Sequence, residues 1–279
     1  MPELPEVETI KNALKKEILN AKILNTQILC RKFRYPISNN FEDNCKNATI
    51  KNINRIAKYI ILTLDNGQSI IWHLGMSGKI KICQEKNIAI QKHDHVIINT
   101  DKGVLIYNDA RRFGMLDITE SNKINEHKIF KNIGIDPFDE NLTAKFLFEK
   151  LKNKKTAIKI ALLDQSIING IGNIYASEAL YLARIRPDRE SESLNMHECE
   201  SLIEAIRIVL DKAIKAGGST LKDYVKPDGS TGYFQNEHCV YNKTGQRCPN
   251  CTCDINITKG IRQIKQGGRS TFYCQTLQK

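Results

Sequence analysis

The sequence contains no run of about 18 apolar residues, roughly the length that a helix needs to cross a membrane. Its first residues also lack the apolar core of a secretory signal. Internal repeats and low-complexity tracts are absent, so neither a solenoid nor a disordered chain is expected. With 279 residues, of which 41% are hydrophobic, the chain can supply cores for two domains, and we expect a folded cytoplasmic protein.

Acidic residues are too few to balance the basic ones. The chain has 42 Lys and Arg residues against 31 Asp and Glu residues, which gives a net charge of +11 and a pI of about 9.1. An excess of this size favours a polyanionic partner such as nucleic acid. A generically basic protein is the alternative.

The even cysteine pairing of a secreted disulfide framework is also missing. Four of the nine cysteines are scattered and are expected to be reduced thiols: Cys30, Cys45, Cys83 and Cys199. The other five crowd into the last 41 residues: Cys239, Cys248, Cys251, Cys253 and Cys274. The two-residue gap in CPNC lets Cys248 and Cys251 grip one tetrahedral Zn²⁺, and Cys274 offers a third thiolate. The tail therefore resembles a small metal-bound hairpin, with Arg269 between these ligands.

The pattern of apolar residues changes about halfway along the chain. Segments such as HDHVIINTDKGVLIYND alternate β-rich apolar runs with DNG and DKG turns, which is typical of antiparallel hairpins. From about residue 144 the apolar residues recur with helical periodicity, and one long helix stops at Gly217 and Gly218. We expect an α+β protein with three parts: a β domain over 1–130, a helical domain over 131–234 and a metal-bound tail over 235–279. The helical domain ends in a mobile loop over 218–234.

The first ten residues, MPELPEVETI, place two carboxylates beside a proline. Removal of Met1 would leave Pro2 with a free secondary amine next to Glu3 and Glu6. An α-amino group has a pKa of about 7.7 to 8.0, so part of it is neutral near pH 7 and can form a Schiff base. The alternative is a stiff exposed arm whose acids occupy the first turn of a helix.

Other segments carry side chains that suit a DNA duplex. Lys58 precedes an apolar strand and could project into a cleft, although most such lysines are solvated. Met76 lies in a turn between small residues, and Arg111 and Phe113 follow in NDARRFG. Apolar wedges unstack bases and arginine binds exposed base edges, so this group suits insertion into a duplex; a core methionine is the alternative for Met76. His93 is either a strand residue or a phosphate donor.

The stretch SIINGIGNIYASEAL predicts a glycine turn before a helix that begins near Asn173. Amides at this position would suit a phosphate, although an ordinary helix hairpin fits the same pattern. Lys154, Lys155 and Lys159 come just before the turn and favour phosphate contact.

A series of motifs covers nearly the whole chain: MPELPEVET, AKY, HLGMSG, KHDH, RRFG, KKTAIK, GIGNIYASEAL, GGSTLKD, CPNC and GRSTFYC. Together they closely resemble the bacterial formamidopyrimidine-DNA glycosylases. The resemblance implies an N-terminal β-sandwich domain, a helix-two-turns-helix domain and a C-terminal zinc finger. It implies a monomer that acts on damaged double-stranded DNA, excises oxidised purines such as 8-oxoguanine and formamidopyrimidines, and cleaves the strand by β,δ-elimination.

The resemblance also assigns roles to residues. Pro2 would attack C1′ of the damaged nucleotide, and Glu3 would donate a proton to the sugar. Lys58 would be the proton donor in β-elimination, and Arg269 would take that role in δ-elimination. Four residues match DNA-binding positions: His93, Arg111, Lys154 and Asn173. Met76, Arg111 and Phe113 match the trio that fills the gap left by the extruded base, and residues 217–234 match the loop that closes over that base.

The expected zinc site departs from the family pattern at its last position. Leu277 stands where a cysteine partner of Cys274 belongs, and leucine cannot bind zinc. Either Cys253 is the fourth ligand, or Cys239 or His238 swings in, or zinc is held weakly or lost. One structural zinc per chain is the expected cofactor, with no metal at the active centre.

Two rival functions fit parts of the same pattern. A non-catalytic DNA-binding module would bind duplex with steep salt dependence and never nick it. An enzyme of the related endonuclease VIII kind would prefer oxidised pyrimidines. The intact Pro2, Glu3 and Lys58 favour the oxidised-purine glycosylase, provided that Met1 is removed, because a retained methionine turns the amine into an amide.

Overall fold

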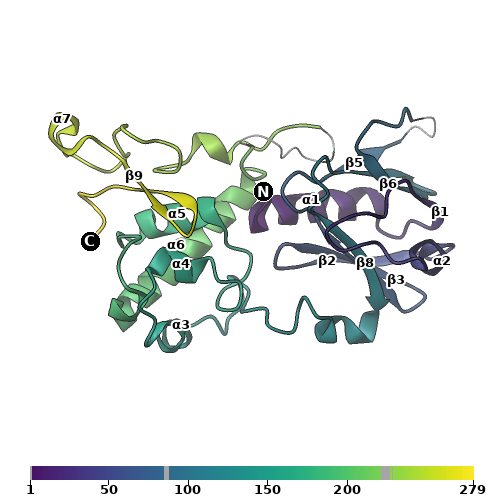
Figure 1. The fold of residues 1–279 in the computed structure, drawn as a ribbon, viewed down its shortest axis with the longest axis horizontal. Helices are drawn as coiled ribbons and strands as arrows, with labels where there is room; N and C mark the ends of the chain where they lie inside the picture. Colours follow the sequence, from purple (N-terminus) through teal and green to yellow (C-terminus); the bar gives the residue numbers. More distant parts are fainter. Residues whose placement is uncertain (1, 85–87, 221–226, 228) are drawn as a thin grey trace. The chain divides into compact units, whose positions relative to one another are not determined.

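The computed structural model describes residues 2–84, 88–220, 227 and 229–279. The chain forms two compact units: Met1–Lys131 with Ile214–Gln235, and Asn132–Ala213 with Asn236–Lys279. Figure 1 shows the course of the chain through both. Among the described residues, none of the helices combines the length and the apolar character that a membrane span requires.

The first unit is a β-sandwich. One antiparallel sheet has the order β1 (Ile23–Ile28), β6 (Asp94–Thr100), β7 (Gly103–Asn108) and β5 (Lys79–Cys83). The other has the order β2 (Ile50–Ile56), β3 (Tyr59–Leu64), β4 (Gln68–His73) and β8 (Met115–Glu120). The DNG and DKG sequences join β3 to β4 and β6 to β7, so the predicted hairpins are confirmed.

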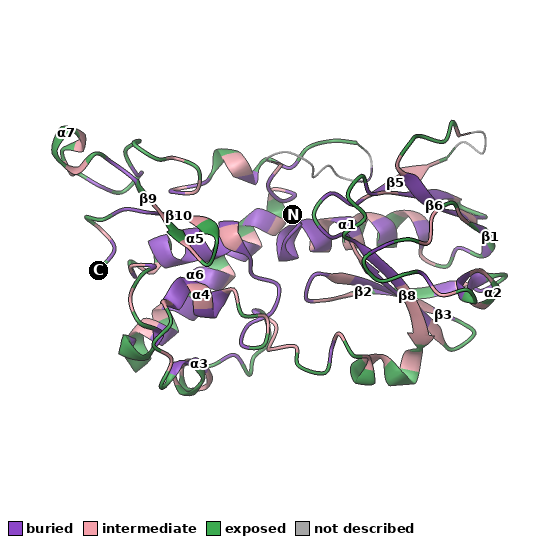
Figure 2. Ribbon diagram, viewed as in Figure 1, coloured by how far each residue is buried: buried purple, intermediate pink, exposed green. Residues whose placement is uncertain are grey.

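The core of the first unit lies between the two sheets and one face of helix α1 (Leu4–Ile18). The helix buries Val7, Ile10, Leu14 and Ile18, whose spacing of three and four residues makes one apolar stripe. Trp72 of β4 packs into the same core and is fully buried. Burial of each large aliphatic side chain in this core stabilises the fold by about 1.5–3 kcal/mol. Figure 2 shows buried residues along α1 and the strands. The short helices Phe41–Cys45 (α2) and Ser121–Glu126 complete this part.

The second unit is helical and ends in a small hairpin. Its helices are α3 (Ala144–Leu151), α4 (Ile158–Leu162), α5 (Asn173–Leu182) and most of α6 (Met196–Lys215), whose last two residues belong to the first unit, with short helices at Ser191–Ser193 and Ile255–Thr258 (α7). A further short helix, Phe234–Asn236, begins in the last residues of the first unit. Helix α6 ends before Gly217 and Gly218, which have positive φ angles of +78° and +81°, as predicted. Strands β9 (Arg262–Gln266) and β10 (Arg269–Tyr273) pair in the tail. The α+β class, with a sandwich followed by helices and a cysteine-bearing hairpin, is confirmed.

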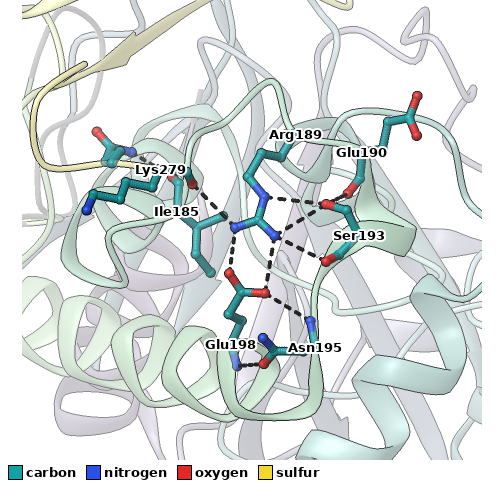
Figure 3. A network of polar contacts seen from close by, with 8 residues as sticks. Ile185, Arg189, Glu190, Ser193, Asn195, Glu198 and Lys279 are labelled. Atoms are coloured by element: carbon teal, nitrogen blue, oxygen red, sulfur yellow. Dashed lines mark hydrogen bonds and ion pairs between the residues drawn. The ribbon is translucent and has the colours of Figure 1, made fainter.

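Arg189 joins the start of α6 to the end of the chain (Figure 3). Its guanidinium donates to the two carboxylate oxygens of Glu198, at 2.5 and 3.2 Å, and to the carbonyl oxygen of Lys279 at 3.4 Å. Glu198 and Asn195 exchange two further hydrogen bonds, each 2.9 Å, which form a capping box. The hydrogen bond from Arg189 is the main reason that the pKa of Glu198 lies below its ordinary value.

Candidate functional site

The described N-terminal residues are buried at the start of α1. Glu3 is 3% exposed, and its amide N–H donates to Oε2 of Glu6 at 2.8 Å as part of a capping box. Pro2 is buried too, so the alternative of an exposed arm is wrong, although Glu6 does lie in the first helical turn. Met1 lies outside the described residues.

Glu6 also holds the segment that follows α6. Its Oε1 atom accepts the amide N–H of Ser219 at 2.8 Å. Gly218 adopts φ +81°, and a Cβ at this position would lie 2.8 Å from Oε1 of Glu6, so the backbone passes close to the carboxylate. The N–H of Phe234 donates to the carbonyl oxygen of Gly218 at 3.1 Å, which closes the base of the predicted capping loop. Residues 221–226 and 228 of that loop lie outside the described residues.

Lys58 lies in the turn between β2 and β3 and is only 8% exposed, so it is not a solvated lysine. Ala57 before it has a φ of +52°, and the carbonyl oxygen of Ala57 accepts a hydrogen bond from Arg55 at 3.0 Å. Arg55 forms an ion pair with Glu8 of α1 at 2.8 Å. The turn that carries Lys58 is thereby tied to the helix that begins beside Pro2.

His73, at the end of β4, is a candidate site residue that sequence reasoning missed, because its pKa responds to the charge of Lys58. Its Nδ1 atom accepts the amide N–H of Gly75 at 3.1 Å, which places the ring proton on Nε2. Burial, followed by the positive charge of Lys58, lowers the pKa of His73 to about 4. The ring is therefore neutral at pH 7.

The structure brings Met76, Arg111 and Phe113 together on the first unit. A Cβ added to Gly75 would lie 2.4 Å from the carbonyl carbon of Phe113, so the HLGMSG turn touches the RRFG loop directly. The Arg111 guanidinium lies 4.6 Å from the centre of the Phe113 ring. Met76 is 37% exposed and Phe113 is 46% exposed, so Met76 is not a core residue. Large apolar side chains that cluster at a surface mark binding sites.

A basic cavity of about 470 Å³ adjoins this group. Its lining contains four basic side chains and no acidic one, which suits an anionic ligand such as a DNA phosphate. The lining residues are Lys32, Phe33, Arg34, Arg111, Arg112 and Phe113. Sequence reasoning missed the contribution of residues 32–34, although two basic residues beside an aromatic one were visible there.

His93 lies just before β6, where its carbonyl oxygen accepts the amide N–H of Asp109 at 3.0 Å. The pairing of β6 with β7 shifts register between Asp94 and Val96. His93 therefore adjoins the RRFG loop through its backbone.

In the second unit, Asn173 begins α5 and bonds to two other elements. Its side-chain nitrogen donates to the carbonyl oxygen of Ser270 at 2.9 Å, and its side-chain oxygen accepts a hydrogen bond from Lys159 at 2.6 Å. Lys159 is fully buried and also donates to Oγ1 of Thr271 at 2.6 Å. The expectation that Lys159 contacts phosphate with Lys154 and Lys155 is therefore wrong, because its ammonium group is used inside the protein.

Arg269 begins β10, after a Gly-Gly turn, and is exposed. The bonds from Asn173 and Lys159 to Ser270 tie the Arg269 hairpin to α5 and α4. Lys154 lies in the loop between α3 and α4, and its carbonyl oxygen accepts the amide N–H of Glu192 at 3.0 Å.

Three of the tail cysteines form a candidate metal site. The sulfur atoms of Cys248, Cys251 and Cys274 all lie within 4.8 Å of one another, and all three residues are buried. Cys253 lies outside this group of three; it packs against the hydrophobic cluster that contains these cysteines, and its sulfur accepts a hydrogen bond from Thr258 at 3.5 Å. Leu277 packs against the cluster as well.

Glu178 of α5 is a further residue that sequence reasoning missed. It is 3% exposed and accepts the amide N–H groups of Cys239, Val240 and Tyr241 at 2.7, 3.0 and 2.7 Å. Burial raises its pKa, which these hydrogen bonds partly offset. Glu178 thus anchors the first residues of the tail to the helix that begins with Asn173.

The sequence matches known domains over most of its length. Residues 1–116 match the formamidopyrimidine-DNA glycosylase N-terminal domain, and residues 133–225 match the formamidopyrimidine-DNA glycosylase H2TH domain.

Full-length relatives agree with these matches. The chain is 46% identical over 279 residues to the formamidopyrimidine-DNA glycosylase of Rickettsia africae, with 100% of this chain and 99% of the relative covered. The structure is similar to a complex between the Lactococcus lactis Fpg and an abasic site containing DNA, with a TM-score of 0.90, 35% identity and 99% of each chain covered. It is equally similar to the wild-type Lactococcus lactis enzyme with a N7-Benzyl-Fapy-dG containing DNA, with a TM-score of 0.90, 35% identity and 100% of each chain covered.

Proposed function

The chain belongs to the formamidopyrimidine-DNA glycosylase family, and we propose that it excises oxidised purines from duplex DNA and cleaves the strand at the resulting abasic site. The substrates are 8-oxoguanine paired with cytosine and ring-opened formamidopyrimidines. The observation that carries this proposal is the buried Pro2-Glu3 start, held by Glu6 in the same unit as the buried Lys58.

The reaction begins at the nitrogen of Pro2, which becomes a secondary amine when Met1 is removed. The neutral nitrogen attacks C1′, the bond from C1′ to the base breaks, and the base leaves with the bonding electrons. Glu3 donates a proton to the sugar as the ring opens, and a cationic iminium forms between Pro2 and C1′. Its positive charge makes the C2′ proton acidic enough to leave.

Strand cleavage follows from that acidity. A water molecule takes the C2′ proton, its bonding electrons form the C2′–C3′ double bond, and the 3′ phosphate leaves with the electrons of the C3′–O bond. Lys58 is the proton donor in this β-elimination. A second elimination, the δ-elimination, then breaks the bond from C5′ to the phosphate oxygen on the 5′ side. Arg269 is the proton donor in this step. No metal takes part in these steps.

The surface residues have a separate task. The target base must leave the stack at a cost of a few kcal/mol, and Met76, Arg111 and Phe113 fill the gap that it leaves. Arg111 also contacts DNA, together with His93, Lys154 and Asn173. The exposure of Met76 and Phe113 and the basic cavity beside them support this assignment.

Cys248, Cys251 and Cys274 would hold a structural zinc ion. Thiolates that share one zinc lie about 3.8 Å apart, because each Zn–S bond is about 2.3 Å. Three buried sulfurs within 4.8 Å of one another fit this requirement. These three ligands would link CPNC to the end of the Arg269 hairpin through the metal. Cys253 is the candidate for the fourth position, and a site of three thiolates is the alternative.

The proposed partner is damaged double-stranded DNA, and the protein acts as a monomer in the bacterial cytoplasm, at the nucleoid. The net charge of +11 supports a polyanionic partner. A gel-filtration mass of one chain for the free protein tests the monomer, and a mass near 64 kDa, twice the 31.8 kDa of one chain, would contradict it.

Borohydride trapping on 8-oxoguanine duplex tests the enzymatic proposal. The wild-type protein should form a covalent adduct and cleave the strand, whereas Pro2→Gly should do neither. Binding with steep salt dependence but without nicking would favour the non-catalytic module, and a preference for oxidised pyrimidines would favour the endonuclease VIII alternative.

A further inference from the structure

Asp109 lies at the point where the two surface loops of the first unit meet. It follows β7 directly, opens the RRFG loop, and is fully buried. Neither its type nor its position marks it in the sequence as more than a turn residue before two arginines.

The carboxylate of Asp109 accepts hydrogen bonds from both loops. Its Oδ1 atom accepts the hydroxyl of Ser77 at 2.6 Å and the amide N–H of Arg111 at 3.3 Å. Its Oδ2 atom accepts the amide N–H of Gly114 at 2.9 Å and the hydroxyl of Tyr107 at 3.3 Å. One side chain therefore links the residue after Met76 to the two ends of the RRFG segment.

The backbone of Asp109 makes further bonds in the same place. Its carbonyl oxygen accepts the amide N–H of Arg112 at 3.2 Å and contacts Nε2 of His95 at 3.0 Å. Arg112 has a φ of +53°, which non-glycine residues rarely adopt, so the loop is held in a strained conformation. The amide N–H of Arg34 donates to the carbonyl oxygen of Arg112 at 3.2 Å and braces this turn from the other side.

The backbone of both loops packs tightly against the hydroxyl of Tyr107, which itself bonds to Asp109. A Cβ on Gly114 would lie 1.7 Å from the hydroxyl of Tyr107, and a Cβ on Gly78 would lie 2.7 Å from the same oxygen. A loss of the Asp109 bonds would therefore move the backbone on which the exposed Met76 and Phe113 depend.

We propose that Asp109 is the positioning residue that holds Met76, Arg111 and Phe113 as one wedge for insertion into the duplex. This inference rests on the proposed function, since a wedge matters only if a base must be extruded. Asp109 touches no reacting atom; it acts through the two loops. Asparagine at this position can replace one acceptor oxygen, but its NH₂ group would face the N–H of Gly114.

The test compares excision of 8-oxoguanine with cleavage of a preformed abasic site, which requires no base to be unstacked. Asp109→Asn should lower kcat/KM for excision by about 30- to 100-fold, in line with the cost of misplaced groups. Its abasic-site cleavage should stay within about threefold of wild type under that same reasoning. A 2-aminopurine beside the lesion should show less fluorescence gain on binding, because the base is extruded less often.

Two other variants keep the result interpretable. Ser77→Ala removes one donor but keeps the carboxylate, so it should lower excision about three- to tenfold while the lyase reaction persists. Asp65→Asn, at an exposed loop carboxylate that accepts the N–H of Thr49 at 2.9 Å, is the matched control and should behave as wild type.

Equal loss of excision and lyase activity in both Asp109→Asn and Ser77→Ala would overturn the inference, because it would indicate general damage to the fold. Wild-type excision by folded Asp109→Asn would overturn it too. Failure of the wild-type protein itself to release 8-oxoguanine would instead refute the proposed function, and the two failures are therefore distinguishable. If Asp109→Asn does not fold, Ser77→Ala decides alone.

Discussion

The ammonium group of Lys159 lies 2.6 Å from the side-chain oxygen of Asn173 and donates a hydrogen bond to it. The same group donates to Thr271 at 2.6 Å and to the carbonyl oxygen of Ser270 at 3.2 Å, and the side chain is fully buried. A buried cation is unfavourable unless acceptors surround it, and here three acceptors come from α5 and β10. Lys159 therefore joins α4 and α5 to the hairpin that carries Arg269.

Replacement of Lys159 by Met keeps the side-chain length and removes the charge. The oxygens of Asn173 and Thr271 lose their donor, so we expect the unfolding free energy to fall by about 2 to 4 kcal/mol. Affinity for duplex with an abasic-site analogue should fall about tenfold, which corresponds to roughly 1.4 kcal/mol. Urea unfolding and a binding titration measure the two effects. Lys145→Met, at an exposed position of α3, is the control; wild-type stability in Lys159→Met would contradict the account.

Glu178→Gln should loosen the start of the tail. Glutamine has one acceptor oxygen, whereas the carboxylate serves three backbone N–H groups at residues 239–241. We expect a loss of about 1 to 3 kcal/mol and faster amide hydrogen exchange at these residues. Glu204→Gln, on the exposed face of α6, provides the comparison. Unchanged exchange at 239–241 would show that the carboxylate does not anchor this segment.

Acidification should destabilise the first unit through His73. Its pKa is lowered from the ordinary 6.5 to about 4 by burial and by Lys58, so the unfolded chain binds the proton more readily between these pH values. The unfolding free energy should therefore fall as the pH drops from 6.5 to 4, with a slope of up to about 1.4 kcal/mol per pH unit from this residue. Urea unfolding across this range should show a shallower slope for His73→Gln. An identical slope in His73→Gln and wild type would refute the assignment, with exposed His197→Gln as control.

The zinc site should respond to the residue at position 277. Leu277→Cys restores a fourth thiolate beside Cys274, so zinc transfer to a competing chelator should slow at least about tenfold. Cys248→Ser should abolish zinc binding. Metal analysis of Cys253→Ser tests the fourth ligand: loss of zinc assigns Cys253, and retention of one zinc excludes it as a required ligand. Absence of zinc from the wild-type protein, expressed with zinc supplied, would contradict the whole site.

Local sequence signals predicted the elements on which the site is built. The DNG sequence predicted the turn at 65–67, and the glycines after residue 216 predicted the end of α6, because each depends on the conformation of a few adjacent residues. The two-residue gap between Cys248 and Cys251 likewise predicted two neighbouring thiolates, which lie with Cys274 in the structure. Motif resemblance supplied the family and the candidate catalytic residues.

Long-range polar contacts could not be predicted in this way. Asp109 binds Ser77 across 32 positions, Lys159 binds Thr271 across 112, and Glu178 binds Cys239 across 61. Each partner is an ordinary polar residue, and only the fold shows that the group between them is buried. For this reason the sequence predicted that Lys159 binds phosphate, whereas in the structure it is buried and donates hydrogen bonds inside the protein.

The central claim is that Pro2 is the nucleophile, and peptide mapping of the borohydride-trapped complex tests it most directly. The mature wild-type protein should begin at Pro2, and after digestion the sugar remnant should be found on the N-terminal nitrogen of that residue. A remnant on Lys58 or another lysine, or base release without any trapped adduct, would contradict the account.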